Sequence, residues 1–377
     1  MEPWEKALID EEAFLDTVHG KISCQECHQG QQSPDKETAH TDLIPYPSDD
    51  PEAFCGDCHP NLVSSAANSL HTSLAGYWTV LESRGVLEDH PPAEEMFDNH
   101  CVGCHASCGD CHVSRPTSVD GGFIDGHVFQ AKPSMTNNCI ACHGSRVGNE
   151  YMGKHENLKA DVHFRQGRMT CVDCHTGYEM HGMPANCLEC HAGPLTNQVP
   201  PPDHRYDGLQ SPSCESCHAS VAAGNDGNYM HEQHSGTLSC QVCHSVSYTN
   251  CDGCHVSLSE ETGSPVFATE GSYLGFYIGK NTLQSYARPY EYEPVRHVPI
   301  SMTSFDYYET GMVSNFEGRE TWVYTTPHNI QRFTPQMESC ANCHGNSDIF
   351  LTADKITPGE LEANRDVIVD VIPPLPK

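Results

Sequence analysis

Cysteine and histidine occur in this chain as one repeated unit, Cys-x-x-Cys-His, in which two thiols and one imidazole lie within five residues. All 22 cysteines belong to such units, so two cysteines per unit make eleven units. Two thiols at this spacing can form thioethers with a porphyrin while the adjacent imidazole reaches the iron, which makes the unit the attachment signature of c-type haem. The units are Cys24-Cys27-His28, Cys55-Cys58-His59, Cys101-Cys104-His105, Cys108-Cys111-His112, Cys139-Cys142-His143, Cys171-Cys174-His175, Cys187-Cys190-His191, Cys214-Cys217-His218, Cys240-Cys243-His244, Cys251-Cys254-His255 and Cys340-Cys343-His344.

Thiols at Cys-x-x-Cys spacing also serve zinc ribbons and disulfide frameworks. The histidine after each pair separates these alternatives. Histidine accounts for 25 of the 377 residues, so its occurrence by chance after all eleven pairs has odds of roughly one in ten trillion. Neither a zinc ribbon nor a disulfide framework requires that histidine. The sequence therefore predicts eleven covalently attached c-type haems, each with its iron.

The remaining histidines can supply the second axial ligand of each iron. Of the 25 histidines, eleven stand in the units and fourteen do not, which is three more than eleven irons need. Every haem can thus be bis-histidine, a low-spin arrangement without a vacant position. We predict His90, His155 and His204 to be surplus, and the eleven methionines to be packing residues. The predicted distal ligands are His19, His40, His71, His100, His127, His163, His181, His231, His234, His297 and His328.

The elements that position these residues are expected to be short. One haem for about every 34 residues leaves little chain for an ordinary hydrophobic core, so the porphyrins themselves should form it. The apolar content is 37%, with 30 glycines and 26 prolines, and long periodic stretches are missing. The sequence predicts a mostly irregular fold with short α-helices, organised around a stacked haem chain. We expect one of these helices at 70–83, carrying His71.

The spacing of the units divides the chain into three predicted regions. Residues 1–255 form a ten-haem electron-transfer region, in which similar sequences near 100–114 and 240–257 indicate duplicated two-haem modules. Residues 256–339 lack a unit but hold eight of the fifteen tyrosines, and their β-branched and aromatic content predicts a small β-containing segment. Residues 340–377 contain the last unit and an extended tail. Its segment 366–372 resembles a strand that could join the sheet edge of a neighbouring subunit or pack on its own chain.

The charge and hydropathy of the chain bear on its surroundings. The formal net charge is −31, which disfavours nucleic acid as a partner and favours basic redox proteins, metal cations and oxide minerals, although the same charge also keeps an extracellular protein soluble. No apolar run is long enough for a membrane span. Haem is attached to such units outside the cytoplasm, so we expect an export signal to have preceded Met1 and the protein to be extracellular, on the cell surface or periplasmic.

With these units in place, the chain resembles the multihaem c-type cytochromes of metal-reducing and sulfur-metabolising microbes. Segments 101–116 and 170–182 are similar to segments of small multihaem carriers and octahaem oxidoreductases. The chain is also similar in kind to extracellular cytochromes that polymerise into conductive, nanowire-type filaments. That resemblance implies a homopolymer of stacked bis-histidine haems, sometimes with a distal histidine donated by the next subunit, and it concerns class rather than proven function.

Two functions follow as expectations. The first is a non-enzymatic conduit, without catalytic residues, that passes electrons through closely packed haems to extracellular acceptors such as metal oxides or cells. The second is a reductase of nitrogen or sulfur oxyanions, similar to hydroxylamine oxidoreductase or tetrathionate reductase, which needs one open haem. The lack of a Cys-x-x-Cys-Lys unit, the sufficient supply of histidine and the acidity of the chain favour the conduit.

Overall fold

The structure is a computed structural model, and it describes residues 11–87, 89–155, 157–182, 212–246, 249–269, 271–284, 289–298 and 301–377. Side chains are not described at 11, 249–252 and 272–274. The predicted haem unit Cys187-Cys190-His191, the surplus residue His204 and the side chain of Cys251 lie outside the described part.

Contacts between residues divide the chain into two compact units built from interleaved segments. The first unit comprises Met1–Leu74, Gly103–Ser145 and Thr170–Asn186, and the second comprises Ala75–Val102, Arg146–Met169 and Cys187–Lys377. Spacing in the sequence did not suggest this interleaving. The predicted regions 1–255, 256–339 and 340–377 concern haem content and stay a prediction.

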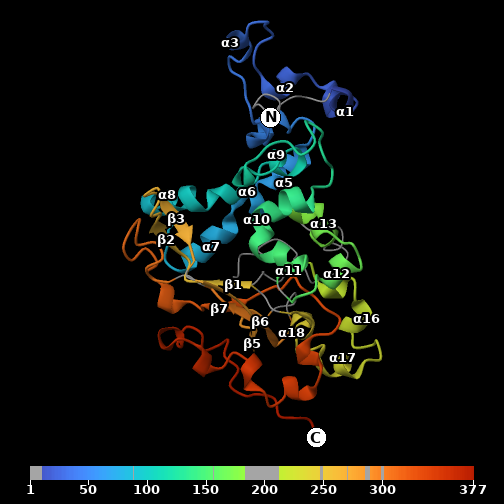
Figure 1. Ribbon diagram of the computed structural model, residues 1–377, viewed down its shortest axis with the longest axis vertical. Coiled ribbons are helices and arrows are strands. Elements are labelled where there is room, and N and C mark those ends of the chain that lie inside the picture. Colours follow the sequence, from blue (N-terminus) through green and yellow to red (C-terminus); the bar gives the residue numbers. More distant parts are fainter. Residues whose placement is uncertain are drawn as a thin grey trace. The chain divides into compact units, whose positions relative to one another are not determined.

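The helices are short, as predicted (Figure 1). The expected helix over 70–83 is two helices, because Leu74 between them takes a left-handed conformation with φ 52°. The first unit contains α1 (Glu11–Leu15), α2 (Cys24–His28), α3 (Lys36–Ala39), α4 (Pro51–Phe54), α5 (Pro60–Ala66), α6 (Leu70–Ser73), α9 (Cys108–His112), α10 (Ile140–His143), α13 (Cys171–Cys174) and α14 (Gly177–Met180). The second contains α7 (Ala75–Ser83), α8 (Pro91–His100), α11 (Asn149–Tyr151), α12 (Val162–Arg165), α16 (Ala219–Ala222), α17 (Tyr229–His234) and α18 (Cys240–His244).

Several Cys-x-x-Cys-His units form a helical turn because a Ser or Thr stands before the first cysteine and an acidic residue before the second. In α13, Thr170 caps the helix and its backbone N–H donates to Asp173 at 2.6 Å. This reciprocal capping satisfies two backbone donors at the helix start, and α2 and α9 have the same arrangement. A helical turn places residues i, i+3 and i+4 on one face. Both cysteines and the histidine of such a unit therefore share a face.

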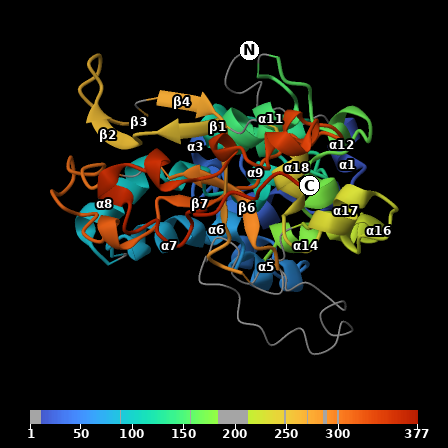
Figure 2. The same ribbon diagram turned by 90° about the horizontal axis from the view of Figure 1, so that it is seen from below.

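Strands lie only in the second unit within the described part of the chain, and they form three antiparallel sheets. One sheet has the order β5 (Tyr277–Lys280), β6 (Tyr292–His297) and β7 (Trp322–Tyr324), with α18 packed against β6 (Figure 1). Two separate pairs, β1 (Thr249–Asp252) with β4 (Gly271–Leu274) and β2 (His255–Leu258) with β3 (Pro265–Ala268), are visible in Figure 2. The predicted β-containing segment is confirmed, although its first strand begins at Thr249, before the predicted boundary.

The second unit has a hydrophobic core made of polypeptide. Val295, Trp322 and Leu351 pack with Val367 and Ile368 of the C-terminal tail, which we define as residues 366–377. Val369 donates its backbone N–H to the carbonyl of Leu351 at 2.8 Å. The tail thus packs on its own chain, one of the two expected outcomes. No regular strand forms over 366–372.

The first unit is different. Among the described residues, the buried hydrophobic side chains of this unit are Leu74 and Val113 alone. Yet this compact unit contains five complete Cys-x-x-Cys-His motifs and most of a sixth. So few buried apolar side chains are a small interior for a domain of this length.

Candidate haem sites

Among the described residues, seven pairs of histidine rings lie at nearly one separation, between 6.0 and 6.2 Å from centroid to centroid. In each pair, one histidine belongs to a Cys-x-x-Cys-His unit and the other, here called a free histidine, stands outside these motifs. Both histidines of a pair lie in the same compact unit of the fold. Seven of the eleven predicted distal histidines are in these pairs. The pairs are His59 with His19, His28 with His127, His143 with His71, His112 with His181, His218 with His163, His244 with His231 and His344 with His234.

The separation of the rings fits two imidazoles on opposite sides of one metal ion. Two metal–nitrogen bonds of about 2.0–2.1 Å, with roughly 1.1 Å from each nitrogen to its ring centre, place the centres about 6.2–6.4 Å apart. The angles between ring planes range from 3° for His112 and His181 to 88° for His71 and His143. Direct ring packing couples the distance to the angle, whereas the distance in these pairs stays constant while the angle varies.

Hydrogen bonds at Nδ1 leave Nε2 available in most of these rings. Among the histidines of the units, His28 donates to the carbonyl of Ile44 at 2.8 Å and His112 to that of Gln130 at 2.6 Å. His244 and His344 likewise meet the carbonyls of Gln331 and Pro374, at 3.1 and 2.8 Å. A proton held on Nδ1 fixes the tautomer in which the lone pair of Nε2 can bind a metal.

The free histidines of the pairs show the same pattern with two kinds of acceptor. Nδ1 of His181 meets the carbonyl of Gly177 at 2.6 Å, and Nδ1 of His234 meets that of Met230 at 2.8 Å. Carboxylates are the acceptors for His163, which meets Asp161 at 3.0 Å, and for His231, which meets Asp226 at 2.7 Å.

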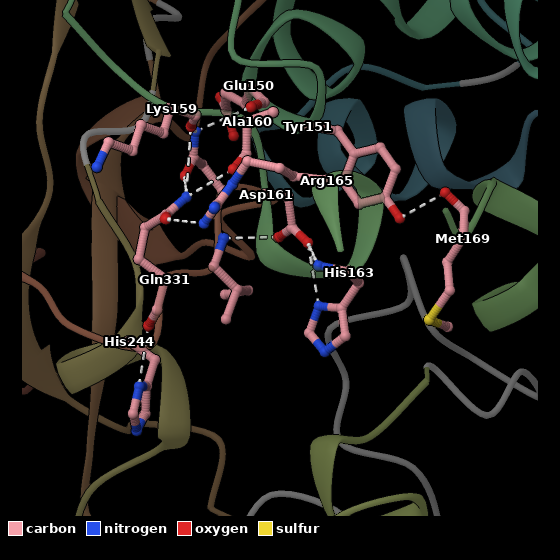
Figure 3. A network of polar contacts seen from close by, with 12 residues as sticks. Glu150, Tyr151, Lys159, Ala160, Asp161, His163, Arg165, Met169, His244 and Gln331 are labelled. Atoms are coloured by element: carbon pink, nitrogen blue, oxygen red, sulfur yellow. Dashed lines mark hydrogen bonds and ion pairs between the residues drawn. The ribbon is translucent and has the colours of Figure 1, made fainter. Parts of the chain in front are cut away.

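Asp161 is held in place from several sides. Its carboxylate accepts from the backbone N–H of His163 at 2.7 Å and of Ile330 at 2.6 Å, and its side chain is 2% exposed. Figure 3 shows this carboxylate directed at the ring of His163. The side chain of the neighbouring Gln331 donates to the carbonyl of Ala160 at 2.9 Å. The backbone carbonyl of Gln331 accepts a hydrogen bond from Nδ1 of His244. Asp161 and the segment 330–331 therefore orient histidines of two different pairs.

Burial disfavours the protonated form of several paired histidines. It lowers the pKa of His71 and of His143 below the usual value, and each ring is further affected by charged neighbours. Burial also lowers the pKa of His19 and His127, with a smaller contribution from the partner ring in each case. In His163 the hydrogen bond to Asp161 outweighs burial and raises the pKa. A neutral imidazole is the form that binds a metal.

Cysteine thiols of different Cys-x-x-Cys-His units also approach one another. The thiols of Cys139 and Cys171 share a hydrogen bond that lowers the pKa of the first and raises that of the second. Cys214 and Cys240 interact in the same way, and a similar bond with Cys104 raises the pKa of Cys142. None of the cysteines whose side chains the structure describes is in a disulfide. Units far apart in sequence are thus neighbours in space.

The other predicted axial histidines have different surroundings. Nε2 of His100 accepts from the hydroxyl of Tyr308 at 2.8 Å, and Nε2 of His297 lies 3.1 Å from both carboxylate oxygens of Glu360. His328 donates from Nδ1 to the carbonyl of Thr326 at 2.8 Å, and His40 is exposed at the end of α3. Among the predicted surplus, Nε2 of His90 meets Glu309 at 2.8 Å.

Three described histidines of Cys-x-x-Cys-His units are not among the seven pairs. They are His105, which is exposed, His175, whose Nδ1 meets Glu179 at 2.9 Å, and His255, whose Nδ1 meets the carbonyl of Gly253 at 2.7 Å. In the described residues there is no group of three or more His, Cys, Asp or Glu side chains placed to hold a metal ion.

Sequence reasoning missed the carboxylates that contact the rings. Asp161 stands two residues before His163 and caps α12, so a local signal existed for it. Asp226 lies five residues before His231, a spacing without a motif of its own.

No family model, curated protein or solved structure matches the chain. Within the described part, no helix has both the length and the apolar character that crossing a membrane requires.

Proposed function

We propose that this protein carries electrons through eleven covalently attached c-type haems with bis-histidine ligation. The observation that carries the proposal is the set of seven histidine pairs, in which a histidine of a Cys-x-x-Cys-His unit and a free histidine lie 6.0–6.2 Å apart. The sequence alone demands one such free partner for each iron. The spacing of the rings and the hydrogen bonds at Nδ1 both suit ligation of iron between the two rings of a pair.

The cysteines and their helical turns supply the covalent anchors. In α2, α9 and α13 the capped turn presents both thiols and the imidazole on one face, so that one porphyrin could be held by all three groups. Bound haem supplies the one-electron ferric–ferrous couple. The chain fixes the spacing: thiol pairs such as Cys139 with Cys171 and Cys214 with Cys240 bring successive attachment sites together.

The scarcity of buried apolar side chains in the first unit agrees with this proposal. Leu74 and Val113 are its buried hydrophobic residues in the described part, and a domain with so small an apolar interior needs another source of stability. Porphyrins attached at its Cys-x-x-Cys-His units would provide large apolar surfaces at those positions.

We further propose a revised set of distal ligands. Three histidines outside the Cys-x-x-Cys-His units meet a side chain through Nε2: His90 with Glu309, His100 with Tyr308 and His297 with Glu360. Eleven irons need eleven of the fourteen histidines outside the units, so three are surplus. We assign the surplus to His90, His100 and His297.

We place this carrier outside the cytoplasm, at the cell surface, in the medium or in the periplasm, because haem is attached to these units after export. The net charge of −31 suits basic redox partners and metal oxides as acceptors. Assembly into a filament of identical subunits is part of the proposal by resemblance to nanowire-type cytochromes.

A reductase of nitrogen or sulfur oxyanions with one open haem is the second candidate. The contacts of His100 and His297 through Nε2 favour it, because two histidines counted as ligands from the sequence meet Tyr308 and Glu360 instead. Tyr308 and His100 would be acid–base groups next to Cys101 in the second unit.

Haem analysis of the exported protein separates these possibilities. We expect eleven covalent haems by mass and by haem assay, with a low-spin ferric spectrum. A substantial high-spin fraction would favour the reductase. Protein that is exported and folded but contains no covalent haem would refute both candidates.

A further inference from the structure

The histidine pairs of the second unit differ in what their Nδ1 atoms contact. For the pair at Cys214-Cys217-His218, the free histidine His163 meets the carboxylate of Asp161. For the pair at Cys240-Cys243-His244, the free histidine His231 meets the carboxylate of Asp226. The pair at Cys340-Cys343-His344 has carbonyl acceptors on both sides, from Met230 and Pro374. Two pairs are thus in contact with a full negative charge and the third is in contact with neutral dipoles.

A carboxylate at Nδ1 changes the imidazole as a ligand. Sharing its proton with an anion makes the ring a stronger electron donor, and the negative charge also favours the more positive oxidation state of a bound iron. Both effects stabilise ferric over ferrous iron and lower its reduction potential. A backbone carbonyl orients the ring as well but brings no net charge.

The two aspartates should lower the reduction potential by different amounts, because their side chains differ in burial. Asp161 is 2% exposed and Asp226 is 22% exposed. Because charges interact more strongly where water is excluded, Asp161 should act more strongly than Asp226. Arg165, a charged residue of this network, donates to the side chain of Gln331 at 3.4 Å.

The three attachment sites are neighbours. The thiol of Cys240 donates to the carboxylate of Glu215, which stands inside the Cys214-Cys217-His218 unit, at 3.6 Å. His231 and His234, which pair with His244 and His344, both lie on α17. The site at Cys240-Cys243-His244 therefore adjoins both others, and these contacts arrange the three sites in series.

We propose that Asp161 and Asp226 are positioning residues that hold two haems of the second unit at lower reduction potential than the haem at Cys340-Cys343-His344, which is thereby the electron-accepting end of this series. The inference rests on the proposed function. One electron leaves a ferrous iron at the first or second site and reduces the ferric iron at the third, and no proton or atom moves with it.

Optical redox titration of the full haem-loaded protein tests the proposal with three variants. Asp161→Asn and Asp226→Asn each remove one of the two charges. Asp370→Asn is the matched control, because it removes the same charge from a 70% exposed residue that pairs with Lys280. We expect each of the first two variants to move one haem in eleven to higher potential, further for Asp161→Asn, with the low-spin spectrum kept. We expect Asp370→Asn to follow the wild type.

Removal of the third site tests the order of potentials. The variant Cys340→Ala/Cys343→Ala should lose one haem from the redox titration. That haem should have a higher reduction potential than the haems that shift in the two aspartate variants. If Asp161→Asn disturbs folding by losing the Ile330 contact, the more exposed Asp226→Asn still decides the question.

This inference would be overturned if the redox titrations of Asp161→Asn and Asp226→Asn superimposed on that of Asp370→Asn in protein with eleven low-spin haems. The electron-carrier proposal would still stand in that case. The proposed order of potentials would be overturned if the haem lost in Cys340→Ala/Cys343→Ala had a lower reduction potential than the haems that shift in the two aspartate variants. Wild-type protein without haem would instead overturn the proposed function.

Discussion

Removal of one distal histidine should convert one haem of the eleven to the high-spin state. His71 is suited to this test because its ring lies 6.1 Å from that of His143 and burial lowers the pKa of both rings. In His71→Ala one iron loses an axial ligand, so about one-eleventh, or roughly 9%, of the ferric haem becomes high-spin. Electron paramagnetic resonance and the optical bands of high-spin ferric haem measure this fraction, and added imidazole should restore the low-spin spectrum.

Variants of other histidines make the test specific. His90→Ala is the matched control, since His90 is 35% exposed and meets Glu309. His297→Ala should also leave the spectrum low-spin because Nε2 of His297 meets Glu360. A fully low-spin His71→Ala protein with eleven haems would refute the reasoning from ring separations. High-spin haem in His297→Ala would refute the revised ligand set alone.

Three further predictions concern folding, and chemical denaturation measures each. Leu351→Ala should destabilise the second unit by about 2–5 kcal/mol, since Leu351 is fully buried in its core, whereas Leu361→Ala, at a 40% exposed position, should cost little. Thr170→Ala should cost about 1 kcal/mol through loss of the cap on α13, and an unchanged stability would contradict the capping argument. Glu360→Gln should be less stable than wild type at neutral pH, because hydrogen bonds from His297 and Thr321 outweigh burial and lower the pKa of Glu360. A lowered pKa in the folded state stabilises above the ordinary value of about 4.3 and is lost as the pH falls through the folded value, so the difference should vanish in acid.

Local features were predictable from the sequence because they depend on neighbouring residues. The helical turns of the Cys-x-x-Cys-His units follow from residues such as Thr170 and Asp173, which stand inside or directly before the unit they cap. The β-containing segment followed from its β-branched and aromatic residues. The break at Leu74 was missed, because a left-handed leucine has no signal in the sequence.

The pairing of histidines depends on tertiary contacts. His163 and His218 are 55 residues apart, and His234 and His344 are 110 apart. The count of fourteen histidines gave the number of partners and most of their identities but not their assignment to units. It also gave no sign that Nε2 of His297 meets Glu360, because Glu360 lies 63 residues further along the chain.

The C-terminal tail connects the polypeptide core of the second unit to the last haem unit. Val367 and Ile368 are buried in the core beside Leu351, and a few residues later the carbonyl of Pro374 accepts from Nδ1 of His344. The backbone N–H of Gly345 donates to the carbonyl of Pro373 at 2.7 Å. The tail thus contacts the Cys340-Cys343-His344 motif at two consecutive residues, His344 and Gly345. The ring at the proposed electron-accepting site is therefore oriented by a segment anchored in the hydrophobic core. The first unit has few buried hydrophobic residues in its described part to provide such an anchor, so we expect its paired histidines to depend more on the proposed haems for their positions.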